Sequence, residues 1–141
     1  MTIPVLTIRQ PWAGLIVAGK KVIENRSFKP PQHLIGQRMA IHAGQAKAPH
    51  AQDLAYVSEA LMQLTPAQRK LVEARGEIIG TVVVDSVIEP YDRPHAREIC
   101  AECELDWWLE SRNGWVLRNP RKLRQPIEAK GRLGIWYTEE L

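Results

Sequence analysis

The sequence is poor in the residues that mark secreted, zinc-binding and membrane-spanning proteins. Its 141 residues include two cysteines, too few for the disulfide framework of a small secreted domain. No apolar run approaches the roughly 18 residues that a membrane span needs, and residues 1–10 lack the basic segment and long apolar core of a signal peptide. We therefore expect a protein of the cytoplasm with no membrane partner.

Sequence signatures of metal and cofactor sites are also missing. The chain contains no glycine-rich phosphate loop and no HExxH, GxSxG or GxGxxG motif. Cys100 and Cys103, with His95 upstream, come nearest to a zinc site, but the other histidines form no second ligand pair. The helical spacing of Cys100, Cys103 and Trp107 favours a buried helix face, with Trp108 more exposed. We expect neither a metal nor a cofactor.

What the chain does have is an ordinary composition for a globular domain. Hydrophobic residues make up 45% and charged residues 25% of the sequence, as in typical soluble domains. A chain of this length builds one modest core, and the sequence holds no internal repeat or linker-like segment. We expect residues 1–141 to form a single domain, and we favour a monomer.

Hydrophobic periodicity predicts five or six short strands with helices between them. The expected strands are residues 5–8, 22–28, 37–43, 77–88, 115–117 and 131–137. The expected helices are residues 11–20, 51–64, 95–111 and a segment from 66 to about 76 that follows a Thr65 capping box, while the proline-containing stretch 119–126 is expected to be a loop. Strands and helices do not alternate as in successive βαβ units, so we predict an α+β fold. It is a small mixed β-barrel with a peripheral helical insert at about 51–76.

The most informative stretch is residues 6–26, which combines a strand, a short helix and a second strand. Gly19 is placed to end the helix in the left-handed conformation. Alternation along the second strand puts Glu24 and Arg26 side by side on one face. Lys21 lies at the hinge between the helix and that strand. Function is therefore expected at these joints.

Lys21 and Glu24 are the candidate catalytic pair. A lysine becomes a nucleophile or base when its pKa falls, through burial or through a nearby cation such as Arg26. A carboxylate beside it can carry a proton to a leaving amine. The alternative is structural: Glu24 and Arg26 pair on the sheet, and Lys21 binds a phosphate or a helix end. Asn25 and Arg26 are expected to contact the ligand of a functional site here.

Gln10, Trp12 and His42 form a candidate pocket for a nucleobase. Gln10 offers a donor and an acceptor together, as a base edge requires, and an indole face can stack a base. Two structural alternatives stay open. Trp12 lies on the apolar face of the short helix, which favours a place in the core over stacking, and His42 can be a hydrogen-bonded structural histidine.

The charge is distributed unevenly, although the net charge is only +3. Acidic residues crowd positions 98–110, and basic residues follow from 112 to 132. Such a basic segment attracts phosphate through its field and through counterion release. The alternative is a solvated face with no partner. The residues expected to grip an RNA backbone are Arg118, Arg121, Lys122 and Arg124.

At the level of motifs, the chain resembles the ASCH domain family, which is related in fold to the PUA RNA-binding domain. The resemblance rests on Gln10-Pro11-Trp12-Ala13, on the GxKxxExR spacing from Gly19 to Arg26, on Ala40-Ile41-His42-Ala43, and on a similar ending from Gly114 to Trp136. It implies a PUA-like barrel with helices at its ends. Small relatives with this fold act as amidohydrolases on N4-acetylcytidine and use a lysine that matches Lys21, but they carry threonine where this chain has Glu24. Other relatives are described as ribonucleases.

Three functions follow from these residues and this resemblance, and the least favoured is a protein-interaction module that uses the helical insert at 51–76. The first is a nucleic-acid-binding module, for RNA or a nucleotide, with a cleft formed by the two motifs and flanked by the basic C-terminal third. The second is a small hydrolase that acts on a modified nucleoside or on RNA, with Lys21 as nucleophile or base. An enclosed cleft favours the hydrolase, and an open groove continuous with residues 118–124 favours the binder.

Overall fold

The fold is a six-stranded mixed sheet with four α-helices and three short 3₁₀-helices among the described residues. The computed structural model describes residues 2–139 and 141. The strands are β1 (Ile3–Gln10), β2 (Ile23–Arg26), β3 (Arg38–Lys47), β4 (Glu77–Ile88), β5 (Asn113–Glu128) and β6 (Ile135–Thr138). The helices are α1 (Trp12–Val17), α2 (Ala55–Met62), α3 (Pro66–Glu73) and α4 (Arg93–Ile99), with 3₁₀-helices η1 (Gln32–Leu34), η2 (Ala51–Asp53) and η3 (Glu102–Trp107).

The sheet is open, so the predicted α+β class is confirmed but the closed barrel is wrong. Its strand order is β2-β5-β4-β3-β1-β6, in which only β1 and β3 are parallel. The edge strands β2 and β6 are four residues each and pair on one side only, with β5 and β1. A barrel would need these edges to pair with each other. Instead a side chain spans the gap, because Arg26 on β2 donates through Nη2 to the Thr7 carbonyl on β1 at 3.0 Å.

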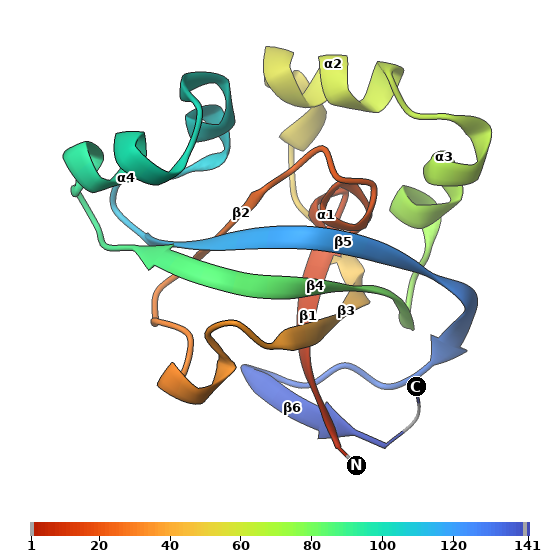
Figure 1. Cartoon of the computed structure of the whole chain (residues 1–141). Helices are drawn as coiled ribbons and strands as arrows, with labels where there is room; N and C mark the ends of the chain where they lie inside the picture. The colour runs from red at the N-terminus through yellow and green to blue at the C-terminus, as the bar shows by residue number, and fades with distance from the viewer. Residues whose placement is uncertain (1, 140) are drawn as a thin grey trace.

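Helix α1 is held between the sheet and the helical insert. Figure 1 shows α2 and α3 gathered beside α1 on one side of the long strands β4 and β5, with β6 on the other side. Ile16 and Val17 pack into the main core, while Leu15 contacts a second cluster from α2. The approach of α1 to α3 is close, since a Cβ at Gly14 would lie 2.5 Å from the Cα of Val72. The insert, predicted to be peripheral, is thus part of the core.

The predicted loop at 119–126 is wrong, because those residues belong to β5. Pro120 and Pro126 are tolerated there for two reasons. Beyond Val116, β5 has β4 as its neighbour and no longer pairs with β2, so an amide is not needed on that side. The register with β4 also shifts between Thr81 and Val83, opposite Pro120, and a bulge absorbs a residue that cannot donate.

The helical predictions are confirmed in part. The Thr65 capping box is present at the start of α3. The predicted helix 95–111 is instead α4 followed by η3, and its orientation differs from the expected one, since Trp108 is buried and Trp107 is partly exposed. Among residues 2–139 and 141, no helix has the length and apolar character that crossing a membrane requires.

Candidate functional site

A cavity of about 790 Å³ opens at the gap in the sheet. Strands β1 and β2 both contribute walls, and the rest comes from the end of β3 and from the segments around α2, η3 and β6. Its lining contains Thr7, Ile8, Arg9, Trp12, Lys21, Glu24, Asn25, Arg26, Gly44, Gln45, Ala46, Leu54, Tyr56, Trp107, Leu109, Arg112, Arg132, Leu133 and Gly134. The sequence-predicted residues Trp12, Lys21, Glu24, Asn25 and Arg26 are therefore brought together.

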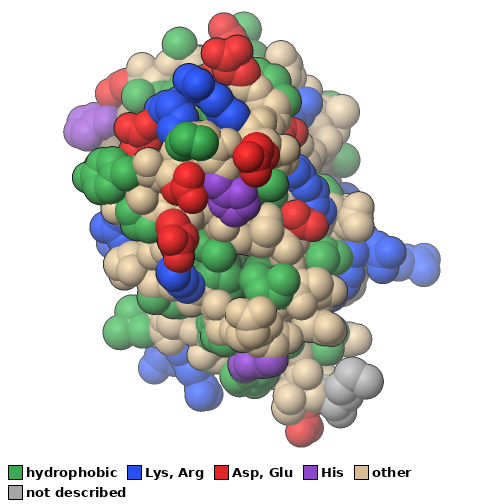
Figure 2. All heavy atoms as spheres, turned by 60° about the vertical axis from the view of Figure 1, so that its left-hand side comes forward, with side chains coloured by type: hydrophobic (Ala, Val, Ile, Leu, Met, Phe, Trp, Pro, Cys, Tyr) green, Lys and Arg blue, Asp and Glu red, His purple; other side chains and the backbone are tan. Residues whose placement is uncertain are grey.

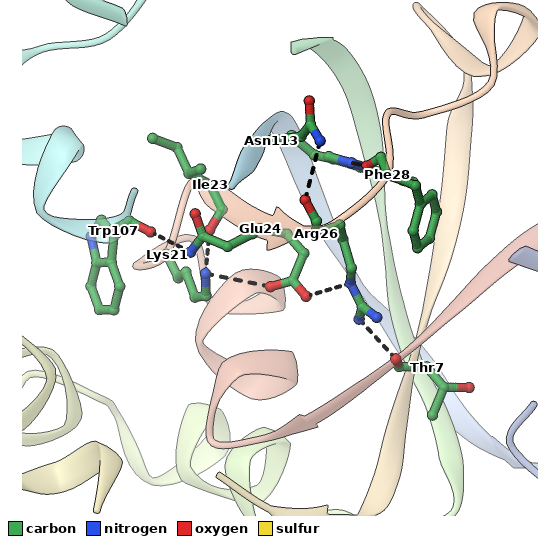
Figure 3. A network of polar contacts seen from close by, with 10 residues as sticks. Thr7, Lys21, Ile23, Glu24, Arg26, Phe28, Trp107 and Asn113 are labelled. Carbon is green, nitrogen blue, oxygen red and sulfur yellow. Dashed lines mark hydrogen bonds and ion pairs between the residues drawn. The ribbon is translucent and has the colours of Figure 1, made fainter. Parts of the chain in front are cut away.

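Lys21 is aimed into this cavity by the tight end of α1. Gly19 adopts a φ of 80°, and the Lys21 amide donates to the Leu15 carbonyl at 3.1 Å, which reverses the chain so that it can enter β2. The Lys21 side chain is only 4% exposed. Its Nζ donates to the Ile23 carbonyl and lies 3.4 Å from Oε1 of Glu24 (Figure 3).

Glu24 is shared between two cations. Arg26 donates from Nε to Oε2 of Glu24 at 2.9 Å, while Lys21 faces the other carboxylate oxygen. Figure 3 shows Lys21, Glu24, Arg26 and Thr7 as one continuous chain of polar contacts. The pairing of Glu24 and Arg26, which belongs to the structural alternative for these residues, is present. The arrangement holds one negative and two positive charges with fixed geometry.

The electrostatic environment weakens the hold of Lys21 on its proton. Burial lowers the pKa of Lys21 from its usual value of 10.5; the attraction of Glu24 opposes this, and repulsion from Arg26 adds to it. The neutral amine is the form that attacks a carbonyl or accepts a proton. Because the pKa is lowered, the neutral amine of Lys21 forms at a lower pH than that of a lysine in water.

An aromatic cluster borders the ammonium. Trp12 and Trp107 meet edge to face with ring centroids 6.4 Å apart, and Tyr56 packs against Trp107 at 5.0 Å. Lys21 Nζ lies 5.4 Å from the ring centroid of Trp12 and 5.9 Å from that of Trp107. Such contacts stabilise a cation by about 0.5–2 kcal/mol. Trp12 therefore packs against other aromatic rings and also lines the cavity, so neither the core position nor the pocket position predicted for it excludes the other.

Trp107 and Tyr56 were not predicted as site residues. Trp107 was assigned to a buried helix face from its spacing with the cysteines. The helix breaks between α4 and η3, which rotates the later residues and turns Trp107 toward the cavity. Asn25 fixes this wall: its Nδ2 donates to the Trp107 carbonyl and its Oδ1 accepts from the Leu109 amide, both at 2.8 Å. The Asn25 amide is thereby occupied within the protein.

Only the two ends of the predicted basic segment 112–132 reach the cavity, and the residues expected to grip an RNA backbone do not. Arg9, Arg112 and Arg132 line it together with Lys21 and Arg26, whereas Arg121, Lys122 and Arg124 do not. Arg118 borders a separate hollow of about 110 Å³ and donates to the Ile99 carbonyl. On the α4 side of the molecule, acidic and basic side chains are interspersed (Figure 2). An open groove that joins the cavity to residues 118–124 is the feature expected of a binder, and it is not found, because the cavity lining does not extend there.

Gln10 and His42 also lie outside the cavity lining, contrary to the sequence prediction. Gln10 is 1% exposed, donates to the carbonyls of Leu71 and Ala74, and accepts from the Gly14 amide. His42 is equally buried and contacts the Ala129 carbonyl through Nε2 at 2.6 Å. Both are polar residues that complete backbone hydrogen bonds in the core, which was the structural alternative for His42.

No cluster of three or more His, Cys, Asp and Glu side chains suited to a metal occurs in the described part of the chain. Cys100 is buried and Cys103 is exposed, so the two thiols do not present a common face. Burial raises the pKa of the Cys100 thiol, which makes it a weak nucleophile and a poor ligand at neutral pH.

Comparisons with known proteins agree on the fold. The chain is similar to the crystal structure of ASCH from Zymomonas mobilis, with a TM-score of 0.55 and 15% identity over 97% of this chain and 87% of that one. Two variants of the same protein give TM-scores of 0.54 and 0.53, also at 15% identity and 97% coverage of this chain, covering 88% and 90% of theirs. No curated protein matches the sequence. The model of the ASCH domain matches residues 6–127, so this chain belongs to the ASCH domain family.

Proposed function

We propose that this protein binds single-stranded RNA and takes one nucleotide into the cavity between β1 and β2. The ASCH family is generally thought to bind RNA. The observation that carries the proposal is the combination, in one cavity, of an aromatic cluster with five cations and a single carboxylate. The cations are Arg9, Lys21, Arg26, Arg112 and Arg132, and the carboxylate is Glu24.

The cavity has the size and chemistry for one nucleotide. Its volume of about 790 Å³ falls in the usual range of roughly 300–1,000 Å³ for small-ligand sites. Trp12, Tyr56 and Trp107 offer ring surface to a base, and stacking on an aromatic side chain contributes about 1–3 kcal/mol per base. Arg112 and Arg132 enter no ion pair with any described residue. Their guanidinium groups are thus available to a phosphate.

Binding of a mononucleotide and of a short single-stranded RNA, followed by fluorescence anisotropy and calorimetry, tests this proposal. Trp107→Ala should lower the affinity for both ligands by roughly 10-fold, because stacking is lost. Arg132→Gln should also lower the affinity for both ligands and should flatten its dependence on salt. Arg97→Gln on α4 is the matched control, since Arg97 is exposed and the substitution removes the same charge. Equal losses in the Arg97 and Arg132 variants would reject the cavity as the binding site.

A second candidate function is hydrolysis of an acylated nucleoside, and the buried Lys21 favours it. With its pKa lowered, the Lys21 amine can take a proton from a water that attacks the acyl carbonyl. Glu24, 3.4 Å away, can then carry that proton to the departing amine. Alternatively the Lys21 amine can attack that carbonyl itself, which displaces the nucleoside amine and leaves an acyl-lysine that one water then hydrolyses to the carboxylic acid and free Lys21. The products are a free amine and a carboxylic acid, so one water is consumed. A carboxylate is a stronger proton acceptor than the threonine of the related amidohydrolases, so Glu24 is suited to this proton transfer.

Incubation with N4-acetylcytidine and with short RNAs, scored by mass spectrometry, tests the second candidate. If it is correct, Lys21→Met should abolish release of the acyl group, and Glu24→Gln should reduce it by about 100-fold or more, as is usual when a general acid or base is lost. Binding of a mononucleotide with no turnover of any of these substrates would leave the RNA-binding proposal and remove the hydrolase.

A further inference from the structure

A pair of arginines on β3 and β5, the two strands that flank β4, forms a second basic site away from the cavity. Arg38 begins β3, and its Nη1 donates to Oγ1 of Thr81 on β4 and to the carbonyl of Asn119 on β5, both at 2.9 Å. Thr81 is paired in register with Arg121 on β5. Arg38 therefore reaches across β4 toward the strand that carries Arg121. None of these residues lines the cavity.

The bulge in β5 creates this arrangement, and the sequence explains the bulge. Pro120 has no amide to donate to β4, and Asn119 adopts a φ of 49°, a conformation that asparagine accepts more readily than most residues. The register with β4 shifts between Thr81 and Val83 as a result. Bulges commonly redirect side chains. Here the bulge turns the Asn119 carbonyl toward Arg38.

Neither guanidinium group has a negative partner in the part of the chain that the structure describes. Arg38 is half-buried and Arg121 is exposed. Within residues 2–139 and 141, no carboxylate forms an ion pair with either of them. Burial and the nearby charge of Arg121 lower the pKa of Arg38, so the two like charges repel. An anion placed between them would relieve this repulsion.

We propose that Arg38 and Arg121 together bind a phosphate of the RNA backbone at the Asn119–Pro120 bulge. Guanidinium forks match phosphate oxygens in two-point contacts, and the Thr81 hydroxyl, which accepts from Arg38, has its own proton to donate. Lys122 pairs with Gly80 and therefore lies on the opposite face of the sheet from Arg121, so the site consists of Arg38 and Arg121. The inference rests on the proposed RNA binding and adds a backbone contact outside the cavity.

The double variant Arg38→Gln with Arg121→Gln tests this site. Affinity for a short single-stranded RNA should fall about 10-fold at low salt, and the slope of log affinity against log salt should decrease by about 0.7 for one lost phosphate contact. Affinity for a mononucleotide, which occupies only the cavity, should not change. The control is Arg69→Gln with Arg97→Gln, which removes the same charge from exposed positions of α3 and α4.

The single variant Arg121→Gln separates a loss of RNA contact from a loss of folding stability. Arg38 holds Asn119 and Thr81 together, so its loss can weaken the sheet, whereas the Arg121 side chain makes no described hydrogen bond. The single variant should keep the melting temperature and still lose about 3-fold in RNA affinity, since it removes one of the two charges on the phosphate. An RNA affinity equal to that of the wild type, or an equal loss in the Arg69 and Arg97 control, would overturn the proposal. A wild-type protein that binds no RNA would instead reject the proposed function.

Discussion

At the scale of single residues, the site depends on a buried lysine that shares its counterion. Lys21 is 4% exposed, and Glu24, its only carboxylate neighbour among residues 2–139 and 141, also accepts from Arg26. Removing an ammonium from water is costly, and one shared carboxylate offsets that cost only in part. The protein retains this arrangement where it opens into a cavity. If position 21 had only a structural role, an apolar side chain of similar length would give a more stable folded state than the buried lysine.

The lowered pKa of Lys21 predicts a specific pH dependence of stability. Between that lowered pKa and 10.5, the unfolded chain binds a proton that the folded chain has released, so the free energy of unfolding rises with pH, by at most about 1.4 kcal/mol per pH unit. Below this window both states are protonated and the term is constant. Lys21→Met lacks the term. Urea unfolding of both proteins from neutral pH to 10.5 measures the difference, which should grow in favour of the wild type; a constant difference would contradict the prediction.

At the scale of elements, the position of the site follows from the packing of α1 against α3. The Gly14 Cα approaches the backbone of Val72, and a Cβ there would lie 2.5 Å from the Val72 amide nitrogen. Backbone atoms cannot move aside as a flexible side chain can. Gln10, which bonds to the carbonyls of Leu71 and Ala74, fixes the same contact from the start of α1.

Gly14→Ala should therefore destabilise the protein, although alanine favours helix. Forcing a methyl group into a filled contact costs about 1–3 kcal/mol, which exceeds the gain of up to ~1 kcal/mol from helix propensity. The melting temperature should fall, and the displaced α1 should weaken nucleotide binding, since Lys21 follows α1 directly. Differential scanning calorimetry checks the first effect. An unchanged or higher melting temperature would show that α1 and α3 are not in close contact.

Local signals predicted much of the fold but not its closure. The β4 run and the Thr65 capping box are determined by neighbouring residues, and both were predicted correctly. Pro120 and Pro126 indicated a loop, because whether a proline is tolerated depends on which side of the strand has a partner, and that is a long-range property. The open sheet has the same origin. No local pattern reports that β2 and β6 fail to meet.

The site was predicted where its residues are close in sequence and missed where they are not. Lys21, Glu24 and Arg26 lie within six positions: alternation placed Glu24 beside Arg26, and the hinge before the strand placed Lys21 near them. Arg9, Arg112 and Arg132 come from three separate segments, and only the fold brings them to one cavity. A surplus of arginine in the C-terminal third was a correct signal of charge. It did not distinguish Arg132, which lines the cavity, from its neighbours on β5.

At the scale of the whole molecule, the gap in the sheet and the cavity are one feature. Strands β1 and β2 are joined across it by the bond from Arg26 to the Thr7 carbonyl rather than by a ladder of backbone hydrogen bonds. Loops that are not held in a ladder open locally at a lower cost in free energy than core strands. The cavity walls formed by residues 107–112 and 129–134 should therefore exchange their amide hydrogens faster than β4.

Binding of a mononucleotide should slow exchange at these walls selectively. A ligand that binds only the closed arrangement stabilises it by RT ln(1 + [L]/Kd), about 2.7 kcal/mol at 100 times Kd, and this applies in full to openings that destroy the cavity. Hydrogen exchange followed by mass spectrometry should show protection in β2, in residues 107–112 and in residues 129–134. The 3₁₀-helix η1 supplies no cavity residue and serves as the internal control, with Trp107→Ala as the control protein. Protection confined to η1, or equal protection in the Trp107 variant, would place the ligand outside the cavity. A ligand slows local opening only when opening breaks its contacts with the protein.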